Sequence, residues 1–175
     1  MANTFVKIST VTVGSGGAAS IAFTSIPQTY TDLKLVTSLR GAAAAVRGTV
    51  RVTFNGISTN YSGRTVRGYD NTTTDSTTSS TSYFDIWRIP AATNTASVFS
   101  NDEIYLPNYA SSNYKSFAAD NTSETNLSSG NTNYLSMSSG LWSNTAAITS
   151  ITFVIADATN FVEYSTATLY GIKSS

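Results

Sequence analysis

Apolar and polar residues alternate with a period of two in many short segments of this chain, and this alternation predicts β-strands. In residues 49–55, Val50, Val52 and Phe54 occupy every second position and polar residues fill the others. We therefore expect these three side chains to face a core. Asn and Gly follow at 55–56, and because both tolerate a positive φ they predict a tight hairpin turn. The partner strand of this hairpin is expected to begin near Tyr61.

Other segments have the same pattern and lie between clusters of Gly, Asn, Ser and Pro. A run of alanines at 41–46 has helical composition but is too short for a stable helix, so we expect a loop or a single turn. Many short strands without a helix predict an all-β protein, an antiparallel sandwich or barrel. The further strands are expected at 3–13, 20–24, 32–39, 83–89, 102–107, 113–119, 133–138, 147–156 and 161–172.

The length of 175 residues predicts one domain that spans 1–175, in which 1–18 form an extended arm or an edge strand. Residues 70–82 contain no apolar side chain, and we expect them to form an exposed loop. This loop is either a tolerated surface insertion or a tip that touches a partner.

The composition removes most catalytic chemistry. The chain has no Cys and no His, which excludes zinc ribbons, most haem ligation and His-dependent nucleophilic catalysis. Adjacent carboxylates at Asp102 and Glu103 point to opposite faces of a strand and cannot share a cleft. We therefore predict a protein that is not an enzyme and has no cofactor and no catalytic or metal site. Asp70, Asn71 and Asp75 could offer oxygens to calcium, but their spacing departs from an EF-hand loop.

The net charge is zero, yet the charges are divided unevenly. Residues 33–69 hold six basic side chains and no acidic one. In the hairpin interpretation Arg51, Arg64 and Arg67 lie on one basic sheet face, which would contact a partner or a second copy of the chain. Pairing with acids of the same fold is the alternative. Zero net charge argues against a nucleic-acid partner, and without 18 consecutive apolar residues we expect no membrane partner.

Tyrosines beside Asn and Ser form the second candidate contact surface. Tyr105, Tyr109 and Tyr114 occur in such a segment, and this composition is typical of recognition surfaces. Packing at the rim of the sandwich and stacking on a sugar would use the same residues. We expect Trp87 and Trp142 to belong to the core.

Four phrases carry a resemblance to a known group of proteins. They are FTSIPQTYTDL at 23–33, RVTFNG at 51–56, NYASSNYKS at 108–116 and ATLYGI at 167–172. They resemble virion structural proteins of tailed bacteriophages, especially phages of aquatic bacteria, and the resemblance extends from about residue 20 to residue 172.

The resemblance implies an antiparallel two-sheet β-sandwich that is jelly-roll-like. It also implies a capsid decoration (cement) protein on the virion, which binds the major capsid protein and copies of itself as a homotrimer. A tail, fibre or adhesin module that binds a host surface glycan is the alternative.

Overall fold

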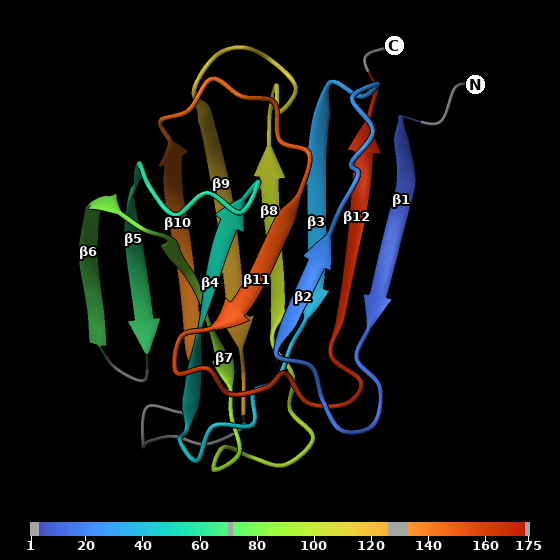
Figure 1. The fold of residues 1–175 in the computed structure, drawn as a ribbon. Coiled ribbons are helices and arrows are strands. Elements are labelled where there is room, and N and C mark those ends of the chain that lie inside the picture. The colour runs from blue at the N-terminus through green and yellow to red at the C-terminus, as the bar shows by residue number, and fades with distance from the viewer. Residues whose placement is uncertain (1–3, 70–71, 126–132, 174–175) are drawn as a thin grey trace.

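A computed structural model describes residues 4–69, 72–125 and 133–173, although of the side chains at 72–81 it describes only Thr73, Thr74 and Ser76. These residues form strands and no helix, as expected from the all-β pattern (Figure 1). The strands are β1 (Phe5–Thr12), β2 (Ser20–Phe23), β3 (Asp32–Ser38), β4 (Arg47–Phe54), β5 (Tyr61–Tyr69), β6 (Thr72–Thr81), β7 (Phe84–Pro90), β8 (Asn101–Leu106), β9 (Lys115–Ser123), β10 (Tyr134–Trp142), β11 (Ile151–Ile155) and β12 (Thr166–Ile172).

The strands form two antiparallel sheets that pack as a sandwich, which confirms the predicted fold class. The eight-stranded sheet has the order β1-β12-β3-β8-β9-β10-β5-β6, and the four-stranded sheet has the order β2-β11-β4-β7. In a jelly roll the first, eighth, third and sixth strands form one sheet, and the second, seventh, fourth and fifth form the other. The strands from β2 to β11 follow this order when β2 is counted as the first strand and β8, β9 and β10 together as the seventh. The first sheet is then β2-β11-β4-β7, and the second runs from β3 through β8, β9 and β10 to β5 and β6. The topology is therefore a jelly roll with a widened sheet.

Two additions widen the larger sheet. The β8–β9–β10 meander replaces one strand, and β1 and β12 pair beside β3 at the sheet's end. The segment expected as an arm or edge strand thus contains β1, an edge strand paired with β12. Four strands cannot cover eight, and at the opposite end β5 and β6 reach beyond the smaller sheet (Figure 1). This uncovered end contains the sites described below.

The core between the sheets is built around aromatic rings. Phe54 contacts Tyr61, Phe117 and Trp142, with ring centroids 5.5–6.0 Å apart. Trp87 stacks on a phenylalanine of β11 at 5.4 Å. Both tryptophans and all three apolar residues expected to face the core from β4 are buried, so these predictions are confirmed.

Gly140 of β10 lies directly against the ring of Phe117. A Cβ at this position would lie 2.0 Å from Phe117 Cζ, and the ring is held edge-on against Phe54 and Phe84. Gly140→Ala is therefore expected to lower the free energy of unfolding by about 1–3 kcal/mol in urea denaturation, because the core is overpacked. Gly14→Ala, with no atom within 4 Å of the added Cβ, is the control. Equal stability of the two variants would show that Phe117 is loosely packed.

The Asn-Gly turn forms, but the predicted hairpin does not. Asn55 and Gly56 have φ of +53° and +66°, and the Ile57 amide donates to the Phe54 carbonyl at 3.0 Å. However, β5 crosses to the other sheet and pairs with β10 and β6. The reason is the buried Tyr61, whose ring stacks on a tryptophan of β10 and whose hydroxyl accepts the Phe54 amide proton. By joining the larger sheet, β5 places the ring and the hydroxyl of Tyr61 against these two partners.

The prediction of an exposed loop at 70–82 is wrong for residues 72–81, because these residues form β6. This strand is an edge of the larger sheet and pairs with β5 alone. An edge strand with an uncovered face needs no apolar side chain, because backbone hydrogen bonds hold it and β-branched threonines favour extended backbone. Residues 70 and 71 lie outside the described residues.

Candidate functional site

Three exposed apolar side chains gather on the outer face of the eight-stranded sheet, which faces away from the core. Val66 of β5 lies opposite Met137 of β10, and Leu135 lies two residues before Met137 on the same face. Their exposed fractions are 54% for Val66, 69% for Met137 and 56% for Leu135. We call these three residues the outer apolar strip. Adjoining exposed apolar side chains of this kind mark interaction surfaces.

Charged residues adjoin the outer apolar strip. Across the sheet, Asp120 lies opposite Met137, and Glu103 follows opposite Asp120 on β8. Arg64 is exposed on the same strand and face as Val66, two residues along β5, and residue 75 of β6 is the register partner of Val66. Charges beside an apolar contact would orient a partner with complementary charges.

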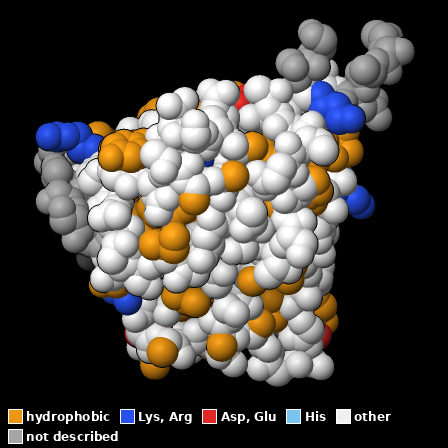
Figure 2. Space-filling model, turned by 45° about the horizontal axis from the view of Figure 1, so that its top comes forward, with side chains coloured by type: hydrophobic (Ala, Val, Ile, Leu, Met, Phe, Trp, Pro, Cys, Tyr) orange, Lys and Arg blue, Asp and Glu red, His pale blue; other side chains and the backbone are white. Residues whose placement is uncertain are grey.

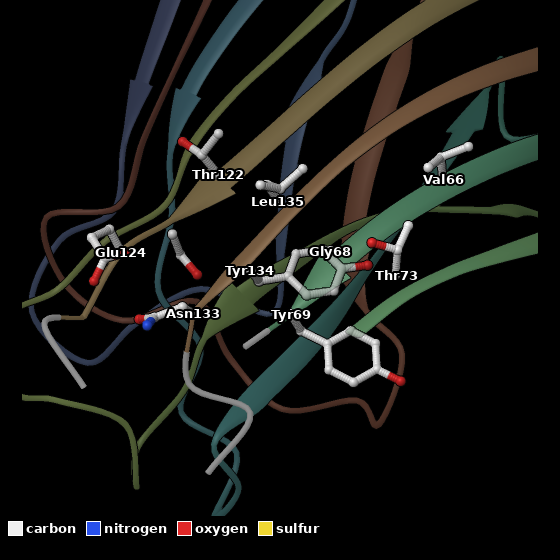
Figure 3. A pocket seen from close by; sticks show the side chains of 10 residues that line it. Val66, Gly68, Tyr69, Thr73, Thr122, Glu124, Asn133, Tyr134 and Leu135 are labelled. Atoms are coloured by element: carbon white, nitrogen blue, oxygen red, sulfur yellow. The ribbon is translucent and has the colours of Figure 1, made fainter. Parts of the chain in front are cut away.

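A pocket of about 640 Å³ adjoins the strip at one end of the sheet (Figure 3). Val66 and Leu135 of the strip belong to its lining, so pocket and strip are continuous. The rest of the lining combines tyrosine rings with hydroxyl, amide and carboxylate groups. These residues are Gly68, Tyr69, Thr73, Thr122, Ser123, Glu124, Asn133 and Tyr134.

The three arginines proposed as one basic sheet face lie on three different surfaces, so that face does not exist. Arg64 is on the outer face of the larger sheet, whereas Arg67, opposite the buried Ser136, faces inward. Arg51 belongs to the smaller sheet, where its Nε lies 3.0 Å from Asp85 Oδ1. The change of sheet between β4 and β5 separates Arg51 from the other two, and the odd spacing of Arg64 and Arg67 on one strand puts them on opposite faces. For Arg51, the alternative of pairing within the fold is the one observed.

The three candidate tyrosines also separate. Tyr105 lies on the outer face of the larger sheet, 41% exposed, and its hydroxyl donates to Asp32 Oδ2 at 2.7 Å. Tyr114 is 60% exposed in the connection between β8 and β9. Tyr109 is fully buried and donates its hydroxyl proton to the Pro27 carbonyl, so it packs the core. Tyr109 therefore does not reach a partner, whereas partner contact by the other five candidate residues stays a prediction.

The adjacent carboxylates of β8 point to opposite faces, as the alternation requires. Glu103 pairs with Lys34 on the outer face, their charged atoms 2.8 Å apart. Asp102 is not a solvated strand-end charge but is buried, and it accepts hydrogen bonds from Thr37, Ser100 and Asn121. Burial raises the pKa of Asp102 to about 7, although these hydrogen bonds oppose the shift. An enclosed carboxyl cannot reach a substrate in solution, so Asp102 serves the fold.

In the ranges 4–69, 72–125 and 133–173, no three Cys, His, Asp or Glu residues come together as a metal site would require. Two of the calcium candidates, Asp70 and Asn71, lie outside these ranges, and the side chain of Asp75 is not described. None of the described segments is a helix long and apolar enough to cross a membrane.

No protein-family model matches this chain, and neither the curated proteins nor the solved structures that were compared with it give a match. The function therefore has to be argued from the surfaces of the molecule. Figure 2 shows one of them, on which hydrophobic side chains are scattered and most of the charged ones lie toward the margin.

Proposed function

We propose that this protein is a non-enzymatic virion structural protein, a capsid decoration (cement) protein that binds and reinforces the assembled capsid lattice. The observation that carries the proposal is the outer apolar strip, because adjoining exposed apolar side chains are typical of a surface that a partner covers. The resemblance of the sequence to virion proteins of tailed phages and the jelly-roll topology support it. The partner is the major capsid protein, on the capsid surface.

The strip suits repeated attachment to a lattice. Methionine has a flexible and polarisable side chain that adapts to the surface it meets. A homotrimer would present three copies of the strip, so that modest contacts act together through effective concentration. The flanking charges at Arg64 and Asp120 would fix the orientation of each copy.

Three of the acidic side chains are engaged in ways that fit a structural role. Asp102 is enclosed, Glu103 pairs with Lys34, and Asp32 accepts hydrogen bonds from Tyr105 and the backbone of residue 108. Glu103 lies opposite Asp120, but its pairing with Lys34 differs from the two free carboxylates across a cleft that hydrolysis would require.

Met137→Glu should weaken binding to capsids stripped of decoration protein by about tenfold or more, because it places a charge in the centre of the buried contact. Arg64→Glu should weaken binding less, since a charge at the rim acts mainly on association. Co-sedimentation with the particles measures both effects. Thr53→Glu puts the same charge on the outer face of the smaller sheet and is the matched control.

Undiminished binding of Met137→Glu, with the circular dichroism spectrum of the wild type, would remove the strip from the contact. Failure of the wild-type protein to bind stripped capsids would overturn the capsid proposal itself.

The pocket beside the strip favours one second candidate, a tail, fibre or adhesin module that binds a host glycan. Tyrosine rings next to hydroxyl and carboxylate groups can stack on a sugar and bond its hydroxyls. A glycan array with clear hits that are lost in Tyr69→Ala would support this candidate. An array without hits would argue against it.

A further inference from the structure

Three arginines from three strands come together where β5 and β6 reach beyond the smaller sheet. Arg47 begins β4, Arg67 lies in β5, and Arg88 lies in β7, the strand at the edge of the smaller sheet. We call these residues the arginine cluster. All three side chains are half-buried, so solvent reaches the cluster.

Tyr134 and Tyr69 lie at the centre of this cluster. The guanidinium carbon of Arg47 is 5.3 Å from the ring centroid of Tyr69 and 5.5 Å from that of Tyr134, which is cation–π distance for both rings. Arg67 lies two residues before Tyr69 on the same strand, and so on the same, inner face. Arg47 is thereby held close to the strand that carries Arg67.

The backbone of Arg88 is tied to the same face of the larger sheet. Its amide donates to Asn121 Oδ1 at 3.2 Å, and Asn121 lies opposite Ser136, which in turn lies opposite Arg67. The charges of Arg67, Arg88 and Arg47 all act on the Tyr134 hydroxyl, and they oppose the rise in the pKa of Tyr134 that burial causes. The three guanidinium groups thus surround one short stretch of the inner face.

Neither of the ion pairs seen among residues 4–69, 72–125 and 133–173 includes an arginine of the cluster. The ion pairs found there are Lys34–Glu103 and Arg51–Asp85, and the second engages the acid that acts on Arg88. Burial and the positive charges of Arg67 and Arg47 lower the pKa of Arg88.

Two donors of the cluster also lack an acceptor. Arg47 Nη1 and Arg67 Nε are buried without a hydrogen-bond partner. Buried donors are normally satisfied, and an unsatisfied one often marks a place where a water or an ion binds. Like charges gathered around such donors favour an anion over water.

We propose that the arginine cluster is a binding site for an oxyanion, a carboxylate or a phosphate group. Guanidinium groups offer paired N–H donors that match two oxygens of either anion, and such charge-assisted bonds are the strong ones. The aromatic rings hold Arg47 in place before the anion arrives, which lowers the entropy cost of binding. Thr74, opposite Arg67 on β6, adds a hydroxyl at the open edge. The arginines lie on the inner face, away from the outer apolar strip, although Tyr69 and Tyr134 also line the pocket beside that strip.

The test uses inorganic phosphate and malonate as probes, each replacing chloride at constant ionic strength. For the wild type we expect a saturable rise in Tm of about 2–4 °C with at least one probe, because a ligand that binds only the folded state stabilises it. Arg67→Gln and Arg88→Gln should each lose this rise. Arg64→Gln should keep it, because Arg64 lies on the same strand and the opposite face.

In chloride alone, Arg67→Gln should melt no lower than the wild type, since the substitution removes repulsion and breaks neither ion pair seen among the described residues. A response to phosphate alone assigns the site to phosphate groups, and a response to malonate alone assigns it to carboxylates; both support the proposal. No response of the wild type, by Tm and by isothermal titration, would overturn it. An equal response of the wild type, Arg67→Gln and Arg88→Gln would also overturn it, because the effect would then be a general one of salt on the surface.

Discussion

The free energy of unfolding is expected to fall by about 4 kcal/mol between about pH 4 and pH 8 through Asp102 alone. In the folded protein the pKa of Asp102 is raised to about 7, while its ordinary value is 3.8. Between these two values the folded state holds a proton that the unfolded chain has lost. Raising the pH therefore favours unfolding, by up to about 1.4 kcal/mol per pH unit. The stabilisation is complete below the lower pKa and is lost as the pH passes the upper one.

Asp102→Asn should remove this dependence. The amide has the shape of the protonated carboxyl, its oxygen still accepts from Asn121, and the hydroxyls of Thr37 and Ser100 can turn to accept its protons. The variant should be less sensitive to pH and more stable than the wild type at about pH 8, where the wild type buries a charge. Urea denaturation at a series of pH values measures the difference.

Asp157→Asn is the control for the Asp102 experiment. The carboxylate of Asp157 is exposed and has a pKa lowered by hydrogen bonds from Thr159, so its contribution has the opposite sign. If Asp102→Asn kept the pH profile of the wild type, the titrating group would have to be sought elsewhere.

Arg40→Ala should lower the free energy of unfolding by about 3–5 kcal/mol, because it leaves several buried carbonyl groups without a hydrogen-bond donor at once. Arg40 is nearly buried, and its guanidinium donates four hydrogen bonds to the backbone of the connection between β7 and β8. The acceptors are the carbonyls of Thr95 at 2.7 Å, Val98 at 2.8 Å, Ala91 at 2.9 Å and Asn94 at 3.2 Å. One side chain thus holds the shape of a whole loop.

Hydrogen exchange distinguishes this role from general destabilisation. In Arg40→Ala the amides of residues 91–98 should exchange faster than those of the neighbouring strands. Arg40→Lys keeps the charge but has at most three donors on one atom, and it should lose part of the stability. Unchanged exchange in 91–98 would show that the loop holds its shape without Arg40.

The alternation of β4 could be interpreted correctly because its apolar residues face a core made of apolar residues. The same interpretation is not possible for β10, where Leu135 and Met137 face solvent while Ser136 and Ser138 are buried. Alternation marks two faces and does not say which one is inside. In β10 the buried face is set by Trp142, because its indole fits only between the sheets. The outer apolar strip is thus invisible in the sequence.

The arginine cluster was equally beyond sequence reasoning. Arg67 and Arg88 are 21 positions apart, and Arg47 reaches them only because β4 and β5 belong to different sheets. The Asn-Gly turn after Phe54 indicates where β4 ends but not which sheet the chain enters next. That choice depends on the partners of Tyr61, which are distant in sequence.

The buried carboxyl of Asp102 belongs to a polar row that crosses four strands, from Thr37 through Asp102 and Asn121 to Ser136. Sliding β9 by two residues would preserve the alternation of buried and exposed side chains, so apolar burial alone would tolerate the error. Asp102 would then lie opposite Ala119 or Ser123 and lose the Asn121 amide. The polar row therefore fixes the register of these strands, because it makes the observed pairing far more favourable than pairings shifted by two residues.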